Sequence, residues 1–196
     1  GAGTTLENLV SYKGTDDGYE FFGGTVSGKN LVSYGNYDDS FDWQDAWSGQ
    51  NNSNWFAYQT GIGNFGMEIE ASSNADNIAP KVNNITLIRA AGTLPEVSGS
   101  AEVSAIQFKK QGTGIFSNVY IDGYKNTGGK NAYSILIQDL ATETSQLKTG
   151  KIKVEPLFAS TYNDNLFNYG YGFTSITPLT FSNAASVTKV SMTGGA

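Results

Sequence analysis

Short runs of alternating apolar and polar residues recur along this chain, separated by Gly, Asn and Asp. When the sequence is shifted by 22 residues, seven of the fourteen positions from Asn8 onward match those from Asn30 onward. A further shift of 24 residues places Asn30 on Asn54 and Tyr34 on Tyr58. A repeat of this length, built of short strands with turns between them, is typical of a parallel β-solenoid, whose coils stack about 4.8 Å apart. The pattern therefore predicts an all-β fold in which equivalent side chains form ladders.

The first three repeats predict three ladders of inward-facing side chains. They are Leu9, Leu31 and Trp55; Tyr19, Phe41 and Phe65; and Phe21, Trp43 and Met67. The last two ladders are two residues apart, and side chains two residues apart on a strand share one face. We therefore expect both ladders to face the core, with Trp43 and Trp55 among the core residues.

The later strands are less regular but still recognisable. The sequence predicts them at residues 84–88, 105–108, 118–121 and 134–137. The best helical candidate is the short segment 141–147, and no apolar period of 3.6 residues extends beyond it. We therefore expect little or no helix.

These patterns predict one domain over residues 1–196, a right-handed parallel β-helix of about seven or eight coils. Residues 1–70 form regular coils of about 22–24 residues, and residues 71–157 form less regular coils. Residues 158–196 contain an irregular, aromatic-rich excursion and the last coil. An excursion of this kind suits a solenoid because the open end of the sheets needs a cap.

Charge and residue usage narrow the possible functions. A net charge of −6 with only 12 Lys and Arg argues against nucleic acid and anionic membranes as partners, since both require a clustered basic surface. The absence of His and Cys excludes the common zinc sites and nucleophilic triads. No apolar run approaches 18 residues, so no transmembrane segment is expected. The chain begins with Gly1, so we expect a processed product or an excised segment.

Several blocks of sequence resemble a family of secreted bacterial surface proteins of the right-handed parallel β-helix type. They are LVSYKGTDDGYEFFGGTVSGKNLVSYGNYDDSFDWQDAWSG, GMEIEASSN, NNITLIRAAGT, IQFKKQGTGIFSNVYIDGY and VSMTGGA. The resemblance implies a secreted or cell-surface location, and it supplies no established reaction and no residues of catalytic role. The closing GGA stops where members of the family often continue, so we expect a truncated chain.

The strongest candidate site is acidic. Six carboxylates are predicted to occupy two adjacent rungs, and they are Asp16, Asp17, Glu20, Asp38, Asp39 and Asp42. Like charges about 5 Å apart repel one another, so such stacking indicates a bound cation, a raised pKa, or splaying into water. Calcium fits best because it accepts several oxygen ligands.

Two other readings of the same residues stay open. The aspartates can make turns and cap backbone amides, as Asp and Asn do in tight corners. A pair of carboxylates, drawn from Asp38, Asp39, Asp42 or the nearby Asp45, can also serve as acid and base in glycoside hydrolysis. Elimination is disfavoured, since the chain has no His and few basic residues near these coils.

Exposed aromatic side chains form a second candidate site, because sugar rings stack on them. Tyr37 and Trp47 fall near predicted turns and are our candidates for glycan contact. A further aromatic cluster occupies residues 162–173.

The function that we predict is a non-catalytic, extracellular structural or adhesive module. It is stabilised by calcium and assembles with copies of itself, end to end or laterally, or binds a surface polysaccharide. The alternative is a β-helix protein that binds or cleaves polysaccharide in the manner of a glycoside hydrolase.

Overall fold

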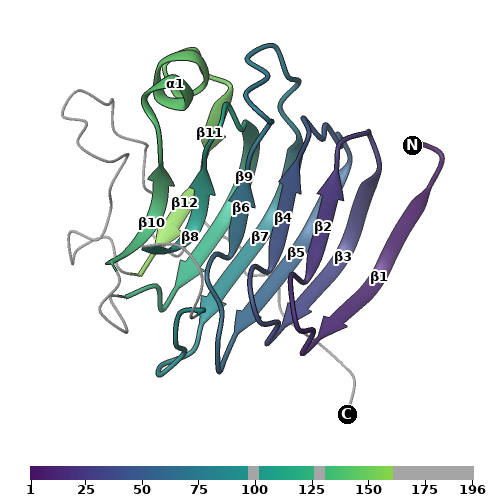
Figure 1. Cartoon of the computed structure of the whole chain (residues 1–196). Coiled ribbons are helices and arrows are strands. Elements are labelled where there is room, and N and C mark those ends of the chain that lie inside the picture. Colours follow the sequence, from purple (N-terminus) through teal and green to yellow (C-terminus); the bar gives the residue numbers. More distant parts are fainter. Residues whose placement is uncertain (97–101, 126–130, 161–196) are drawn as a thin grey trace.

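A computed structural model of the chain describes residues 1–96, 102–125 and 131–160 (Figure 1). Its strands form two parallel sheets, between which the chain alternates. Sheet A has the order β1-β3-β5-β7-β9-β11, with β12 also paired to β9, and sheet B has the order β10-β8-β6-β4-β2. The strands are β1 (Thr5–Tyr12), β2 (Tyr19–Phe22), β3 (Ser27–Tyr34), β4 (Phe41–Gln44), β5 (Asn52–Gln59), β6 (Met67–Ile69), β7 (Lys81–Arg89), β8 (Glu102–Phe108), β9 (Gly114–Asp122), β10 (Asn131–Ile137), β11 (Ile152–Val154) and β12 (Leu157–Ala159). The predicted all-β, parallel β-helix class is confirmed.

The register of sheet A gives the length of each coil. One column of inward-facing side chains runs through Leu9, Leu31, Trp55, Ile85, Val119 and Leu157. Successive coils therefore take 22, 24, 30, 34 and 38 residues. The first two match the predicted period, and the later coils carry longer connections. The described residues thus form five coils and begin a sixth, whereas a constant period predicts about seven or eight in the whole chain.

The first five strands of sheet A each bend at an asparagine. These residues have φ angles between 54° and 61° and are Asn8, Asn30, Asn54, Asn84 and Asn118. Asparagine adopts this left-handed region more readily than most residues. From Asn30 onward, the Nδ2 atom of each donates a hydrogen bond of 2.6–2.9 Å to the Oδ1 atom of the asparagine one coil earlier. In the sixth coil the bend falls at the cis Glu155–Pro156 bond, between β11 and β12.

The core lies between the two sheets and contains Trp43 and Trp55, as predicted, at 1% and 0% exposure. The predicted register of sheet B is wrong in the third coil, because Phe41 pairs with Met67 rather than with Phe65. The connection from β5 to β6 is two residues longer than the connection from β3 to β4, as the paired strands on either side show. Phe65 is instead buried in this longer corner.

Little helix is present in the described residues. The turn α1 (Leu140–Thr142) and the π-helical turn Glu143–Leu147 coincide with the segment that has the best helical sequence. Phe158 lies in β12 rather than in the predicted excursion, most of which is outside the described residues. No helix within the described ranges is long and apolar enough to cross a membrane.

Candidate functional site

The outer face of sheet B carries a ladder of polar side chains. Alternation along β2 turns Phe21 to the core and leaves Glu20 on the opposite face. Glu20 pairs in register with Asp42 of β4, which pairs with Glu68 of β6, and Glu68 pairs with Gln107 of β8. The predicted stacking of Glu20 and Asp42 is therefore present, and it continues into two further coils.

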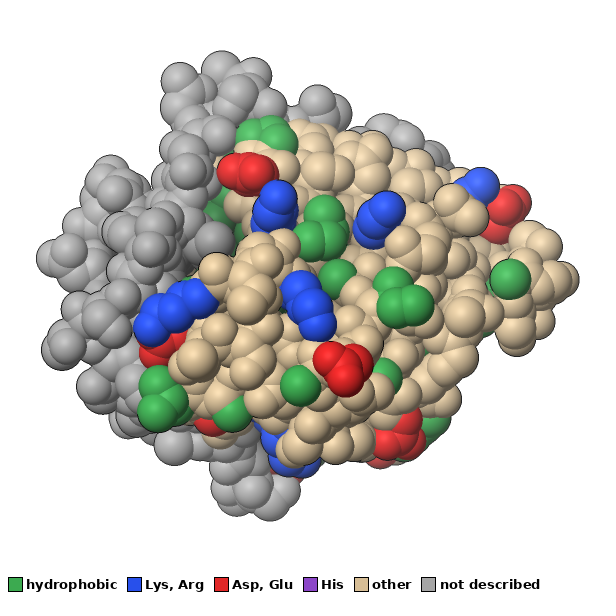
Figure 2. All heavy atoms as spheres, turned by 90° about the horizontal axis from the view of Figure 1, so that it is seen from above, with side chains coloured by type: hydrophobic (Ala, Val, Ile, Leu, Met, Phe, Trp, Pro, Cys, Tyr) green, Lys and Arg blue, Asp and Glu red, His purple; other side chains and the backbone are tan. Residues whose placement is uncertain are grey.

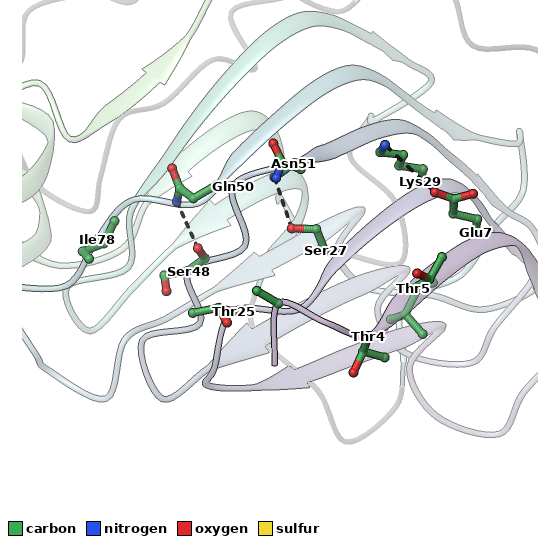
Figure 3. Close-up of a pocket in the computed structure, with 12 residues that line it drawn as sticks. Thr4, Thr5, Glu7, Thr25, Ser27, Lys29, Ser48, Gln50, Asn51 and Ile78 are labelled. Atoms are coloured by element: carbon green, nitrogen blue, oxygen red, sulfur yellow. Dashed lines mark hydrogen bonds and ion pairs between the residues drawn. The ribbon is translucent and has the colours of Figure 1, made fainter.

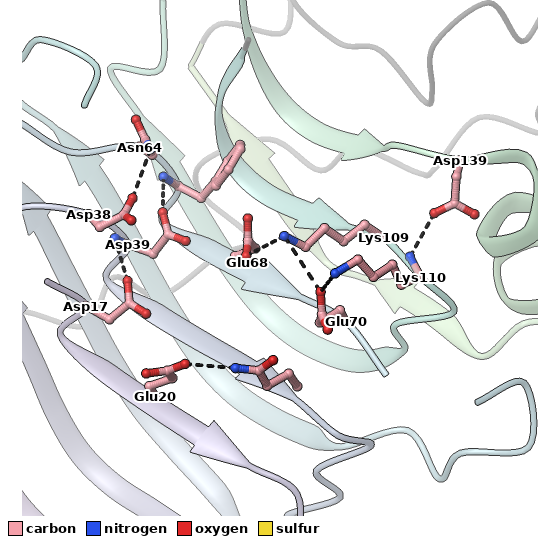
Figure 4. Close-up of polar contacts among 12 residues, drawn as sticks. Asp17, Glu20, Asp38, Asp39, Asn64, Glu68, Glu70, Lys109, Lys110 and Asp139 are labelled. Atoms are coloured by element: carbon pink, nitrogen blue, oxygen red, sulfur yellow. Dashed lines mark hydrogen bonds and ion pairs between the residues drawn. The ribbon is translucent and has the colours of Figure 1, made fainter. Parts of the chain in front are cut away.

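The corner before sheet B adds a second set of acidic side chains (Figure 4). The Oδ1 atom of Asp17 accepts a 2.9 Å hydrogen bond from the Asp39 backbone N–H, and the Oδ1 atom of Asp39 accepts one of 2.8 Å from Phe65 N–H. Asn64 continues the series, since its Oδ1 atom accepts a bond of 2.9 Å from Glu96 N–H. Asp17 and Asp39 therefore cap backbone amides, as one of the open readings proposed, and each bond ties one coil to the next.

These features bring the acidic residues into two overlapping groups. Carboxylate oxygens of Asp16, Asp17 and Asp38 lie within 4.8 Å of one another, as do those of Asp17, Glu20 and Asp42. Asp17 belongs to both groups, whereas Asp39 belongs to neither. Within the described part of the chain, none of these carboxylates forms an ion pair. The charge of Lys109 acts on Asp42 and opposes the rise of its pKa, but the two residues form no ion pair.

The pKa values of the clustered groups reflect this environment. Burial raises the pKa of Asp17 to about 7, with the hydrogen bond from Asp39 N–H opposing the shift and the charge of Asp38 adding to it. Burial and the charge of Glu68 raise the pKa of Asp42 to about 8. Burial also raises the pKa of Asp38 and, more strongly, that of Asp39. The Oδ1 atom of Asp42 is buried and has no hydrogen-bond donor within the described residues.

The basic side chains of this face lie farther along the ladder. The Nζ atom of Lys109 is 2.6 Å from Glu68 and 3.8 Å from Glu70, and Lys110 is 2.7 Å from Glu70. Burial lowers the pKa of Lys109, but the carboxylates of Glu68, Glu70 and Asp42 together outweigh that effect, and the net shift is upward. Lys109 therefore keeps its proton at neutral pH and is unsuited to act as the base of an elimination reaction.

The spacing of the carboxylates indicates which chemistry they suit. Oxygen ligands about 2.3–2.6 Å from a calcium ion lie within about 5 Å of each other, and both acidic groups meet this limit. A retaining glycosidase instead separates its two carboxyl groups by about 5–5.5 Å, and an inverting one by about 6.5–9.5 Å. The two groups around Asp17 thus meet the distance limit for a cation, and 4.8 Å between single oxygens also lies close to the separation in a retaining glycosidase.

The prediction that Trp47 contacts glycan is wrong, because its side chain is buried. It is 1% exposed, stacks on Phe21 at 4.6 Å between ring centroids, and donates from Nε1 to the carbonyl oxygen of Val26 at 2.9 Å. Its corner folds inward because the indole completes the core and its N–H finds a backbone acceptor. Tyr37 is 36% exposed, so its contact with glycan stays a prediction.

Three candidate residues could not be recognised from the repeat, because they depend on the register of β6 or on the outer face of sheet B. Glu68 stands where the alignment placed Gly66, since the two-residue extension of the corner was not visible as a break in the repeat. The alternation of Met67, Glu68 and Ile69, which repeats that of β4, is the signal that could have found it. Lys109 becomes a candidate only through its contact with Glu68. Phe22 is 64% exposed on the outer side of β2.

Other parts of the surface differ from this face. A hollow of about 340 Å³ beside sheet A is lined mainly by hydroxyl and amide side chains, and its charged residues Glu7 and Lys29 are 4.0 Å apart (Figure 3). On the face shown in Figure 2, basic side chains are interspersed with acidic and neutral ones and form no patch. Neither of these two regions shows a cluster of carboxylates without ion pairs like the one around Asp17.

Comparison with known proteins identifies one family. A profile described as a pectate-lyase like beta helix domain matches residues 1–192. No curated protein and no solved structure matches the chain.

Proposed function

Because the chain belongs to the pectate-lyase-like β-helix family, we propose that it is a non-catalytic module of the cell exterior that binds polysaccharide and holds a calcium ion beside sheet B. The observation that carries this proposal is the group formed by Asp17, Glu20 and Asp42. Their oxygens lie within 4.8 Å of one another and have no ion-pair partner in the described part of the chain.

Electrostatics favours a cation at this point. Two unit charges about 4 Å apart interact by about 4 kcal/mol at an effective dielectric constant of 20. Burial is the largest cause of the raised pKa of about 7 at Asp17, and repulsion from both groups adds to it. A divalent ion next to Asp17 reverses the sign of this interaction. Calcium is the ion of choice because it accepts six to eight oxygen ligands in flexible geometry.

The same corner is open to a glycan. Asp16 and Glu20 are exposed, whereas Asp39 and Asp42 are buried, so the acidic groups lie at the border between solvent and protein. Three protein carboxylates leave several positions of a calcium ion for other oxygen ligands, including the hydroxyl groups of a sugar.

Self-association forms a further part of the proposal. Strands β1 and β2 are the edges of their sheets, and unpaired strand edges favour pairing with another chain. Leu9 is 39% exposed in this first coil, whereas its neighbour Leu31 in the second coil is completely buried. Negative-stain electron microscopy with calcium and with a chelator tests this part, for which we expect end-to-end stacks that shorten after chelation. Dispersed particles under both conditions would contradict it.

Glycoside hydrolysis is the second candidate function, and a specific observation favours it. Glu68 is held by Lys109 at 2.6 Å, whereas its register partner Asp42 has an unpartnered Oδ1 atom and a pKa raised to about 8. Two carboxyl groups with such different surroundings can act as a base or nucleophile and as an acid. Here Glu68 would attack and Asp42 would protonate the leaving oxygen.

Calorimetric titration with calcium and with polysaccharides separates these functions. We expect calcium to bind with a dissociation constant of about 10⁻⁴ to 10⁻³ M, as in other extracellular modules. Asp17→Asn and Glu20→Gln should weaken it at least about tenfold. Glu7→Gln is the control, because Glu7 is an exposed carboxylate of sheet A.

Release of reducing ends from the same polysaccharides tests catalysis. The non-catalytic proposal predicts binding and no release. Release that disappears in both Asp42→Asn and Glu68→Gln would establish the hydrolase instead, and failure to bind any polysaccharide would remove both functions.

A further inference from the structure

Phe22 ends β2 with its side chain on the outer face of sheet B. Its neighbour Phe21 points into the core at 7% exposure, whereas Phe22 is 64% exposed. After Phe22 the chain turns through Gly23 and Gly24, both at positive φ angles of 63° and 78°. This left-handed pair favours glycine, and it ends the strand directly after the ring.

The polar neighbours of Phe22 belong to the acidic face. Phe22 pairs in register with Gln44 of β4, and the Nε2 atom of Gln44 donates a 2.9 Å hydrogen bond to the Oε1 atom of Glu20. Glu20 in turn belongs to the carboxylate group with Asp17 and Asp42. An exposed ring, an amide and a carboxylate therefore lie together on two adjacent strands. Phe22 and Glu20 also line a hollow of about 500 Å³ at this end of the solenoid.

A comparison with Tyr12 shows what is unusual about this ring. Tyr12 has the same exposure of 64%, but it stacks on Tyr34 with 5.3 Å between centroids, and the Nζ atom of Lys13 lies 5.3 Å from its centroid. Within the described residues, no aromatic ring and no cation packs against Phe22. Phe22 is thus exposed without a ring or a cation against it in the described part of the chain, whereas Tyr12 belongs to a stack of tyrosines with Tyr34 and Tyr58.

We propose that Phe22 is the stacking platform for one sugar ring of the bound polysaccharide, with Gln44 and Glu20 hydrogen-bonding the hydroxyl groups of that ring. This inference rests on the proposed polysaccharide binding. A pyranose with equatorial hydroxyl groups presents a flat C–H face that packs on an aromatic ring, while its edge needs donors and acceptors. Gln44 supplies both, and Glu20 accepts hydrogen bonds.

The charge at this subsite selects the class of sugar. Glu20 is the only charged side chain of the three contacts, and the nearest basic side chains named on this face, Lys109 and Lys110, pair with Glu68 and Glu70. In the calcium-free protein, a uronate carboxylate placed over Phe22 would meet the Glu20 carboxylate and be repelled by it. Without calcium, the subsite therefore fits a neutral pyranose, such as a glucose unit of a β-linked glucan.

Affinity measurements on single variants test the role of Phe22. The probe is cellohexaose, a soluble neutral β-glucan fragment, with oligogalacturonate of equal length as the charged comparison, and both are measured in the presence of a calcium chelator. Phe22→Ala should weaken cellohexaose binding about tenfold, because the sugar ring loses its aromatic contact. Phe22→Trp should preserve or improve binding. Tyr12→Ala is the matched control with equal exposure and should leave affinity unchanged.

The outcomes separate this inference from the function on which it rests. If the wild-type protein binds neutral glycan and Phe22→Ala binds it equally well, Phe22 is not the platform although the proposed function survives. Equal losses in Phe22→Ala and Tyr12→Ala, or stronger binding of oligogalacturonate through Phe22, would also overturn the inference. If the wild-type protein binds no glycan, both proposals fail. Calcium affinity should be the same in wild type and Phe22→Ala, since the ring is not an ion ligand.

Discussion

Asp17 and Asp39 lie one coil apart and are joined by a hydrogen bond of 2.9 Å from the Asp39 backbone N–H to the Oδ1 atom of Asp17. One oxygen of the Asp17 carboxylate therefore accepts a hydrogen bond that joins the first coil to the second. The same side chain belongs to both groups of clustered carboxylates. One residue thus connects the stacking of the coils with the candidate cation site.

Two substitutions of Asp17 separate these roles. Asp17→Asn keeps an acceptor for Asp39 N–H and removes the charge, so we expect stability at least equal to that of wild type without calcium and a loss of stabilisation by calcium. Asp17→Ala also leaves a partly buried amide unpaired, which should cost about 1–3 kcal/mol in the free energy of unfolding. Urea denaturation with and without calcium measures both effects. Equal stabilisation of wild type and Asp17→Asn by calcium would contradict the proposed site.

The clustered carboxylates predict a pH dependence of stability in the absence of calcium. The pKa values of Asp17 and Asp42 rise from 3.8 to about 7 and about 8 in the folded protein. The folded state therefore binds more protons than the unfolded state between these values. The resulting stabilisation is fully present below pH 3.8 and is lost as the pH rises through about 7 to 8.

We accordingly expect the melting temperature of the calcium-free protein to fall by roughly 5 °C between pH 6 and pH 9, given about 2–4 °C per kcal/mol for a chain of this size. Saturating calcium should abolish most of this fall, because the ion replaces the protons. The double variant Asp17→Asn/Asp42→Asn should show a flatter profile in the absence of calcium. Thermal scans at several pH values provide the measurement, and an unchanged slope in the double variant would rule out these two residues as its source.

Trp47 provides a test of the corrected aromatic assignment. Its indole is buried between the two sheets and donates to the Val26 carbonyl oxygen. Trp47→Ala should therefore lower the free energy of unfolding by about 3–5 kcal/mol. At a temperature where the variant is folded, it should retain glycan affinity. A stable variant that loses glycan binding would restore Trp47 as a contact residue.

The asparagine ladder gives a prediction about the backbone. Asn54 lies in the middle of the ladder, with φ of 58° and side-chain hydrogen bonds of 2.8 Å to Asn30 and 2.9 Å to Asn84. Asn54→Ala loses both bonds and places a Cβ atom in the left-handed region without compensation, so we expect a cost of about 2–4 kcal/mol. Asn54→Gly loses the bonds but accepts this φ angle and should be about 1 kcal/mol less damaging. Chemical denaturation of both variants measures the difference, and an equal cost would show that backbone conformation plays no part.

Much of the fold could be predicted because the repeat is local. Side chains alternate with a period of two along each strand, so a match such as Leu9 with Leu31 determines both the face and the partner of each residue. The same logic placed Glu20 next to Asp42. Prediction failed where the length of a corner changed, as in the two-residue extension that moved Phe65 out of its ladder and hid Glu68.

The sequence by itself determined the class of fold, the stacking of the first coils and the excess of acidic side chains on adjacent rungs. These features depend on the order of residues within one repeat. Only the tertiary structure decided that Trp47 closes the core and that Lys109 reaches Glu68 across the sheet. Those outcomes depend on how the corners direct the chain and on which side chains from distant coils meet, and no local pattern carries that information.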